Sequence, residues 1–375
     1  MSPLHRHNTQ ILLQLLYAAL NPHAELGVSK AALFNTETDW SEVCRYAARQ
    51  GVLAIAWEGL NRLINEGVIA PNQQPSRELR LKWAFSVERI EQRYRKQRKA
   101  MVRLAKIYGQ EGIEMTVLKG YGLSLCYPTP EHRACSDLDI WLGANHQKGD
   151  RLIRERYNIT IDEDEHHHTV FYIDGVMVEN HYDFINIHAH RSSRHIERHL
   201  QQKAQERDYP ISVDGATIHL PNANMHALFL LRHAASHFAA AEIVLRHLID
   251  WAMFIREYHA DIDWKWLKSV CSEAHMERFF DAMNGLAVEY CGLDEGLLPA
   301  FVRRKELEHR IIGDILSPEF SKSKPQGGLL AIVIFKLERW WANRWKHRLV
   351  YNENLAIMFL TQSWSHLLKP KSIKH

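Results

Sequence analysis

The sequence predicts an α+β protein in which a small α/β core of about 110 residues lies between two helical regions. Apolar residues recur at helical spacing before residue 115 and again after residue 222, whereas the stretch between them alternates short apolar runs with turn signals. We therefore expect an N-terminal helical region at 1–110, an α/β core at 111–221, and a C-terminal helical domain at 222–375 with a mobile loop at 317–328.

The N-terminal region is expected to be helical because its apolar residues recur every three or four positions, as Leu60 and Leu63 do. The stretch 81–107 is amphipathic, rich in basic residues, and free of proline and glycine. It predicts one long bridging helix that ends near Gly109 or Gly112.

The core begins with an apolar run at 115–118, which predicts a strand, and Lys119-Gly120 follows it as a turn. The elements expected next are a short helix at 121–127, a strand at 137–142, a helix at 146–157, strands at 169–173 and 176–184, and a last strand at 216–220. Asp174-Gly175 lies between two of these strands and is typical of a hairpin turn.

The C-terminal domain shows the helical pattern again, with helical stretches expected at 225–258, 264–290, 306–315 and 329–367. The sequence between the last two stretches contains glycine, serine and proline, a composition typical of a loop.

The bulk composition excludes several classes of protein. Five scattered cysteines without a C-x-x-C pair argue against a disulfide framework and favour a reducing compartment. No apolar run approaches the roughly 20 residues of a membrane span, and the N-terminus has no apolar signal core, so we expect a cytoplasmic protein without a transmembrane segment. The net charge of +3 is too small to indicate a nucleic-acid partner by itself.

The residues most suggestive of chemistry are Asp137 and Asp139. On a strand, residues two apart face the same side, so these carboxylates are expected to lie together. Paired hard oxygen ligands are what Mg²⁺ prefers. Glu179, in the strand expected at 176–184, offers a third carboxylate, and the three are expected to converge as a metal site.

Two other acids are rivals for the third position. Asp174 lies in the expected hairpin turn, and Asp183 shares the strand face of Glu179 but lies further along. We prefer Glu179. An isolated Asp-x-Asp is common in proteins, whereas an Asp-x-Asp strand followed by another strand that carries an acid is a more demanding pattern.

A run of three histidines at 166–168 also has metal-binding side chains. Adjacent residues on a strand point to opposite faces, so we do not expect all three to reach one ion.

The segment around the acids resembles the signature of an uncharacterised nucleotidyltransferase family within the DNA-polymerase-β-like superfamily. It has Leu-Lys-Gly at 118–120, a Tyr-Pro pair at 127–128, Arg133, and Ser-Asp-Leu-Asp-Ile at 136–140. The strand in which Glu179 stands two residues before a histidine is similar to the family's third-acid strand. The likeness extends over most of the chain between its first helices and about residue 295.

The resemblance implies a polymerase-β-like core that transfers a nucleotidyl group from a nucleoside triphosphate (NTP) to an acceptor. The cofactor would be Mg²⁺ or Mn²⁺ held by Asp137, Asp139 and Glu179, with Lys119, Gly120 and the start of a helix at Tyr121 near the phosphates. The acceptor is left open among a small molecule, a protein and RNA.

The chain departs from the superfamily at the phosphate turn, where many members have Gly-Ser and this sequence has Gly120-Tyr121. A catalytically inactive nucleotide-binding or scaffold protein on the same fold is therefore one alternative function. A nucleic-acid-binding module that uses the basic C-terminal tail is another.

Three further residues are candidates for nucleotide contacts. Arg133 precedes the acidic strand and is expected either to touch phosphates or to anchor its loop. His233 and His237 lie one helical turn apart, and we expect one of them to approach Asp137 and help close the nucleotide site. The alternative is that both contact only the helical domain.

The C-terminal stretch 331–375 has eight basic and two acidic residues, a net charge of +6, with tryptophans among them. This pattern suits contact with nucleic acid or a membrane surface. The alternative is a terminal helix that packs its tryptophans on the helical domain.

Overall fold

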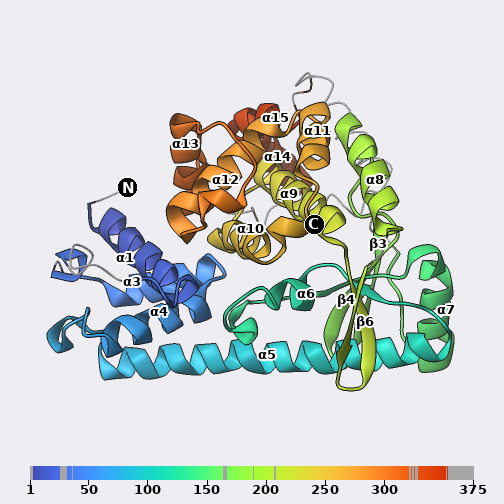
Figure 1. Cartoon of the computed structure of the whole chain (residues 1–375), viewed down its shortest axis with the longest axis horizontal. Coiled ribbons are helices and arrows are strands. Elements are labelled where there is room, and N and C mark those ends of the chain that lie inside the picture. Colours follow the sequence, from blue (N-terminus) through green and yellow to red (C-terminus); the bar gives the residue numbers. More distant parts are fainter. Residues whose placement is uncertain are drawn as a thin grey trace.

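The computed structural model describes residues 3–25, 32–35, 37–163, 167–188, 190–206, 208–320, 322, 325, 328–351 and 353. It is a mixed α/β protein with one small six-stranded mixed sheet and helical regions on both sides of it in sequence (Figure 1). The predicted fold class is therefore confirmed. None of the described helices is long and apolar enough to cross a membrane.

The N-terminal helices are joined to the sheet by one long helix. The helices of this region are α1 (Pro3–Leu20), α3 (Trp40–Arg49), α4 (Leu53–Asn65) and α5 (Arg77–Gln110). The Ser76 hydroxyl caps α5 by accepting from the backbone N–H of Leu79 at 3.2 Å. Figure 1 shows α5 running along the base of the molecule, below the N-terminal helices at one end and the sheet at the other. The predicted bridging helix is thus observed. It begins four residues before the stretch 81–107 and ends at Gln110, near Gly109 as expected.

The sheet has strand order β3-β4-β2-β1-β6-β5. Its strands are β1 (Thr116–Val117), β2 (Leu138–Trp141), β3 (His168–Ile173), β4 (Val176–His181), β5 (Tyr209–Val213) and β6 (Ala216–Leu220). β2 runs parallel to β4 and antiparallel to β1, and β1 runs parallel to β6. The predicted turn at Asp174-Gly175 joins β3 to β4, and both residues have the positive φ that such a tight turn requires.

Two elements near the sheet were not expected from the sequence. They are α8 (Arg191–Ala204) and the edge strand β5. In β5 only Val213 is buried, and in α8 four of fourteen residues are, so neither has a continuous apolar pattern. The two short helices of the core are α6 (Gly120–Ser124) and α7 (His146–Tyr157).

The C-terminal helices are α9 (Ala223–Ala240), α10 (Leu245–Tyr258), α11 (Trp264–Glu273), α12 (Glu277–Cys291), α13 (Lys305–Leu316), α14 (Leu329–Ala342) and α15 (Arg344–Val350). The stretch 225–258, expected to be helical throughout, turns between α9 and α10, and this turn makes the two helices neighbours. Part of the expected mobile loop at 317–328 lies outside the described residues.

The C-terminal tail is described only to residue 351 and at residue 353. Within that part, Lys346 is buried and forms an ion pair with Asp314 at 2.5 Å, and the guanidinium of Arg310 covers the ring of Trp345 at 3.9 Å. These side chains pack on the helical domain, in line with the alternative for this stretch, whereas Trp341 is 62% exposed. The residues beyond 353 that carry much of the basic charge lie outside the described part.

The hydrophobic core has two parts. One cluster contains residues of α1, α3, α4 and of α9 to α13 together, so the helices before and after the sheet share a core. The other lies between α5 and the sheet and includes Leu138, Ile140 and Val178. The acids that alternate with these apolar residues therefore face the helices α9 and α10 on the other side of the sheet.

Buried histidines should make the protein sensitive to acid. His226 and His347 are almost completely buried, and burial lowers the pKa of His226 to about 3 and of His347 to about 4. Below pH 6.5 the unfolded chain protonates both rings while the folded chain does not, so stability is lost as the pH falls. We expect a loss of about 1.4 kcal/mol per pH unit for each imidazole, measured by urea unfolding between about pH 7 and pH 5. His226→Gln should lower the pH dependence by about one proton, and an unchanged dependence would contradict the assignment.

Candidate active site

Two acids meet across neighbouring parallel strands. Asp139 of β2 is in register with Glu179 of β4, so both side chains stand on the same face of the sheet. Ligand atoms of Asp139, Glu179 and His181 all lie within 4.8 Å of one another. Asp137 immediately precedes β2, and its carboxylate accepts from the Ser136 hydroxyl at 3.1 Å. Of the three acids expected to converge, Asp139 and Glu179 therefore lie together with His181, whereas Asp137 lies beside this group and is not one of its members.

The Asp139 carboxylate is the most enclosed charge of the site, at 1% exposed. Lys119 Nζ lies 3.0 Å from its Oδ1, and His181 Nε2 lies 3.1 Å from the same oxygen. Burial alone would raise the pKa of Asp139, but the charge of Lys119 and the hydrogen bond from His181 hold that pKa well below its ordinary value. Asp139 is therefore ionised across the physiological pH range.

Asp137 has the opposite shift. Burial raises the pKa of its carboxyl group, and the negative charges of Asp139 and Glu179 raise it further. The positive charge of Lys119 acts in the opposite direction. Three carboxylates that disfavour one another's charge form a site that a divalent cation would relieve. The donor set of Asp137, Asp139 and Glu179 thus fits Mg²⁺ or Mn²⁺ in chemical type.

A cavity of about 250 Å³ lies beside these acids. Its walls come from the turn after β1, the segment that leads into β2, and the helices α9 and α10. Seven residues singled out in the sequence line it: Lys119, Gly120, Arg133, Asp137, Asp139, His233 and His237. The turn at 119–120 and the two histidines of α9 therefore border the same cavity as Asp137, whereas Glu179 and Tyr121 are not among its lining residues.

Three imidazoles form the helical wall of this cavity. The ring centroids of His233 and His237 lie 4.4 Å apart, and His247 of α10 lies 6.1 Å and 5.9 Å from them. Burial lowers the pKa of all three rings, and Lys119 lowers those of His233 and His237 further. These rings are therefore neutral near pH 7 and offer hydrogen bonds without added charge.

The turn after β1 brings the backbone close to the acids. Gly120 has φ +52°, and a Cβ there would lie 3.5 Å from the carbonyl oxygen of Asp137. The turn leads into α6, which has only five residues and is too short to present a helix dipole to a phosphate. The side chain of Tyr121 is buried and stacks on Tyr94 with ring centroids 5.6 Å apart. Gly120, the first residue of α6, thus lines the cavity, whereas the Tyr121 side chain points into the core, and a phosphate contact of either residue stays a prediction.

Arg133 anchors the loop before β2. Its Nε and Nη2 donate to the two oxygens of Asp250 at 2.7 and 2.9 Å, and its Nη1 donates to the carbonyl oxygen of Gly120 at 3.2 Å. The hydroxyl of Tyr127 also donates to Asp250, at 2.5 Å. Of the two roles weighed for Arg133, the contacts support the anchor.

Sequence reasoning missed the cation of the helical wall. Arg246 lines the cavity and donates to the carbonyl oxygen of Ala134 at 2.7 Å, instead of pairing with Asp250 one turn along its helix. Arg246 and Asp250 are four residues apart on one helix, a spacing that suggests an ion pair. In the structure Asp250 instead pairs with Arg133, which comes from a distant segment.

The rival third acids lie elsewhere. Asp174, at the hairpin turn, accepts from Arg103 of α5 at 2.5 Å. Asp183 follows the end of β4, and burial raises the pKa of its carboxyl group. Among the described residues, neither belongs to the group formed by Asp139, Glu179 and His181.

The comparison with protein-family models agrees with the sequence resemblance. A family model described as uncharacterised nucleotidyltransferase matches residues 36–292, more than two thirds of the chain. Among solved structures, an antigenic nucleotidyltransferase-like protein from Paracoccidioides brasiliensis matches with 12% sequence identity and a TM-score of 0.32, over 52% of this chain and 92% of that one. None of the curated proteins compared with the chain matches it. The family match includes both acidic strands and the helices α9 and α10 that close the cavity, and the chain therefore belongs to this family of uncharacterised nucleotidyltransferases.

Proposed function

We propose that the protein transfers a nucleotidyl group from an NTP to an acceptor, with a divalent cation, Mg²⁺ or Mn²⁺, held by Asp137, Asp139 and Glu179. The observation that carries the proposal is the pairing of Asp139 with Glu179 across β2 and β4, beside a cavity lined by Lys119 and neutral histidines. Membership of a nucleotidyltransferase family supports the general reaction.

The cation, when bound, would polarise the phosphate and lower the pKa of the attacking hydroxyl. The protein's own groups then have positional tasks. Asp139 is held ionised by Lys119 and His181 and is ready to act as a ligand without prior loss of a proton. Lys119, which lines the cavity, places its ammonium group where a phosphate oxygen of the nucleotide would accept a hydrogen bond.

The helical wall would complete the nucleotide site. The pKa values of His233 and His237 are lowered by desolvation and by the charge of Lys119, so these rings can donate to phosphate oxygens without competing with the cation for charge. Because the pKa values of both rings are lowered, we expect no change in nucleotide affinity near pH 6.5 from their protonation. Histidines with an ordinary pKa would cause such a change.

The reaction is tested by incubating the protein with each of four labelled NTPs, Mg²⁺ or Mn²⁺ and a cell lysate, and identifying the molecule that becomes labelled. Label transfer that depends on the divalent cation and is lost in Asp137→Asn supports the proposal. Nucleotide binding without any transfer would instead favour the inactive scaffold.

Replacement of Lys119 gives a separate test of the nucleotide's position. We expect Lys119→Ala to weaken NTP binding by about 1.5–3 kcal/mol, roughly ten- to a hundredfold, because a charge-assisted hydrogen bond to phosphate is lost. Affinity can be measured by calorimetry at saturating Mg²⁺. Lys148→Ala is the matched control, since Lys148 on α7 donates only to the carbonyl oxygen of Glu111 at 3.0 Å. Equal affinities of the two variants would reject the role of Lys119.

A further inference from the structure

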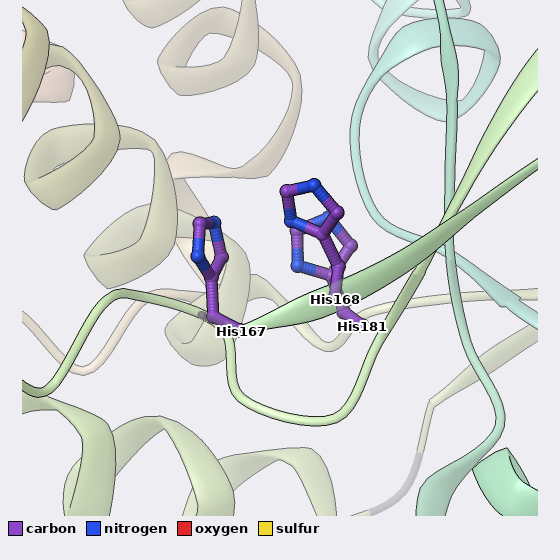
Figure 2. Close-up of side chains that lie close together, drawn as sticks. All are labelled: His167, His168 and His181. Carbon is purple, nitrogen blue, oxygen red and sulfur yellow. The ribbon is translucent and has the colours of Figure 1, made fainter. Parts of the chain in front are cut away.

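Three imidazoles gather beside Glu179, at the end of the β3–β4 hairpin away from its turn. His167 immediately precedes β3, His168 is its first residue, and His181 is the last residue of β4, in register with His168. One nitrogen from each ring lies within 4.8 Å of the others. Figure 2 shows the three rings rising on the same side of the hairpin.

The adjacent histidines reach the same side because His167 lies outside the regular strand. Its carbonyl oxygen accepts from two successive backbone N–H groups, those of Tyr182 and Asp183, each at 3.1 Å. The ring centroids of His167 and His168 lie 4.4 Å apart, and those of His168 and His181 lie 5.1 Å apart. Strand alternation therefore does not separate this pair. The expectation that the three histidines of the run do not all reach one ion stays a prediction, because residue 166 lies outside the described residues.

The carboxylate of Glu179 lies beside two of these rings. Glu179 Oε2 lies 3.8 Å from His168 Nε2 and 3.6 Å from His181 Nε2. His168 is 7% exposed, and its Nδ1 has no hydrogen-bond partner within the described part of the chain. A buried imidazole nitrogen without a partner is costly, and an imidazole nitrogen is a common metal ligand.

We propose that His167, His168, His181 and Glu179 bind a transition-metal ion of the Zn²⁺ or Co²⁺ type. Three nitrogens and one oxygen are a borderline ligand set that favours such ions, whereas the carboxylates of Asp137 and Asp139 favour Mg²⁺. Metal–nitrogen distances of about 2.0–2.1 Å place tetrahedral ligands about 3.5 Å apart, so the rings would close in by about an ångström at most. The ion would sit next to the carboxylate site and share Glu179 with it.

The test is titration of the metal-free protein with Co²⁺, followed by visible absorption. We expect one equivalent to give the intense absorption of tetrahedral Co²⁺, and His168→Gln and His167→Gln each to weaken binding at least tenfold. His199→Gln is the matched control, because His195, His199 and Glu273 form a second, more exposed group of possible ligands. Unchanged binding in both test variants, or loss of binding in His199→Gln, would overturn the proposal.

The test of metal binding is independent of the test of nucleotidyl transfer. Asp137→Asn should abolish transfer yet keep the Co²⁺ spectrum, since Asp137 is not one of the proposed ligands. Circular dichroism of His167→Gln, at the less buried position, separates loss of a ligand from loss of the fold. A folded His167→Gln that binds Co²⁺ as the wild type does would exclude the proposed site.

A second, independent feature is the charge of α5. This helix has eleven basic and three acidic residues, a net charge of +8, whereas the whole chain has +3. The remainder of the chain is therefore at −5. Positive charge is concentrated on the one helix that runs along the base of the molecule in Figure 1.

One face of α5 leads to the acids. Arg89, Arg93 and Lys96 are spaced four and three residues apart, so they share a face, and they line a cavity of about 300 Å³ together with Ser136. Ser136 donates to Asp137. One turn before Arg89, Phe85 is 65% exposed, an aromatic ring available for stacking.

These cations are available to a ligand. Neither Arg89 nor Arg93 forms an ion pair with any described residue, and Lys96 donates to the carbonyl oxygen of Gly175 at 3.3 Å. We infer that this face binds the backbone of a single-stranded nucleic acid whose end reaches Ser136 and serves as the acceptor, an inference that rests on the proposed transfer reaction. A basic groove with an exposed aromatic ring is the usual construction of such sites.

Binding of a labelled single-stranded RNA, measured by fluorescence anisotropy at several salt concentrations, tests this inference without any turnover. We expect the triple variant Arg89→Ala, Arg93→Ala, Lys96→Ala to lose at least tenfold in affinity and about two units of the salt-dependence slope. The control removes three charges from the same helix away from the cavity: Arg77→Ala, Arg80→Ala, Lys82→Ala. Equal losses of RNA affinity in the two variants would refute the acceptor site, as would binding of anionic vesicles without binding of RNA. Neither result bears on nucleotidyl transfer, which is tested separately.

Discussion

Asp137→Asn is expected to lower nucleotidyl transfer by on the order of a thousandfold without destabilising the fold, because it removes a charge that is needed only in the reaction. Burial and Asp139 already raise the pKa of this carboxyl group, so its ionised form does not stabilise the metal-free protein. Loss of the charge relieves repulsion from Asp139 and Glu179, and the free energy of unfolding should stay unchanged or rise. The two measurements are label transfer under saturating NTP and urea unfolding of the metal-free protein.

The matched control for this variant is Asp174→Asn. Asp174 is an acid at the turn of the β3–β4 hairpin that pairs with Arg103, and we expect full activity from the variant. Transfer by Asp137→Asn at the wild-type rate, or equal losses in both variants, would show that Asp137 is not part of the catalytic machinery.

Asp250→Ala should destabilise the protein by about 3–5 kcal/mol, because it leaves the buried Arg133 guanidinium without its counter-charge. Arg133 is 5% and Asp250 7% exposed, and the acid also accepts from the hydroxyl of Tyr127. The pair joins α10 to the loop that leads into Asp137, so the variant should also lose activity. Chemical unfolding measures the first effect, and label transfer the second.

The control is an ion pair on the surface. Arg154 and Glu163 form a bridge in which both side chains are more than half exposed, and Glu163→Ala should cost less than about 1 kcal/mol. If Asp250→Ala costs no more than Glu163→Ala, the buried pair does not hold α10 to the core.

Local pattern was enough to find the acids of the candidate site. Strand alternation predicts that Asp139 stands on the polar face of its strand, between the buried Leu138 and Ile140, and the structure confirms this placement. The same pattern placed Glu179 on a neighbouring strand, where its register with Asp139 brings the two together. The roles of these residues in catalysis remain predictions until they are measured.

Local pattern failed where contacts join distant segments. Arg133 and Asp250 are more than a hundred residues apart, and neither sequence neighbourhood indicates that they form a bidentate pair. His167 escapes strand alternation because two N–H groups beyond the end of β4 bind its carbonyl oxygen. The edge strand β5 and the helix α8 have too few buried residues to show a period.

The sequence by itself determined the α+β class, the long bridging helix and the strand face that holds Asp139, because these depend on the period of apolar residues along one segment. Only the tertiary structure decided that Arg133 is an anchor, that His181 and Lys119 set the charge of Asp139, and that His167 joins His168. Each of these depends on the approach of side chains from separate elements, which is set by strand register and helix packing and leaves no mark in the local sequence.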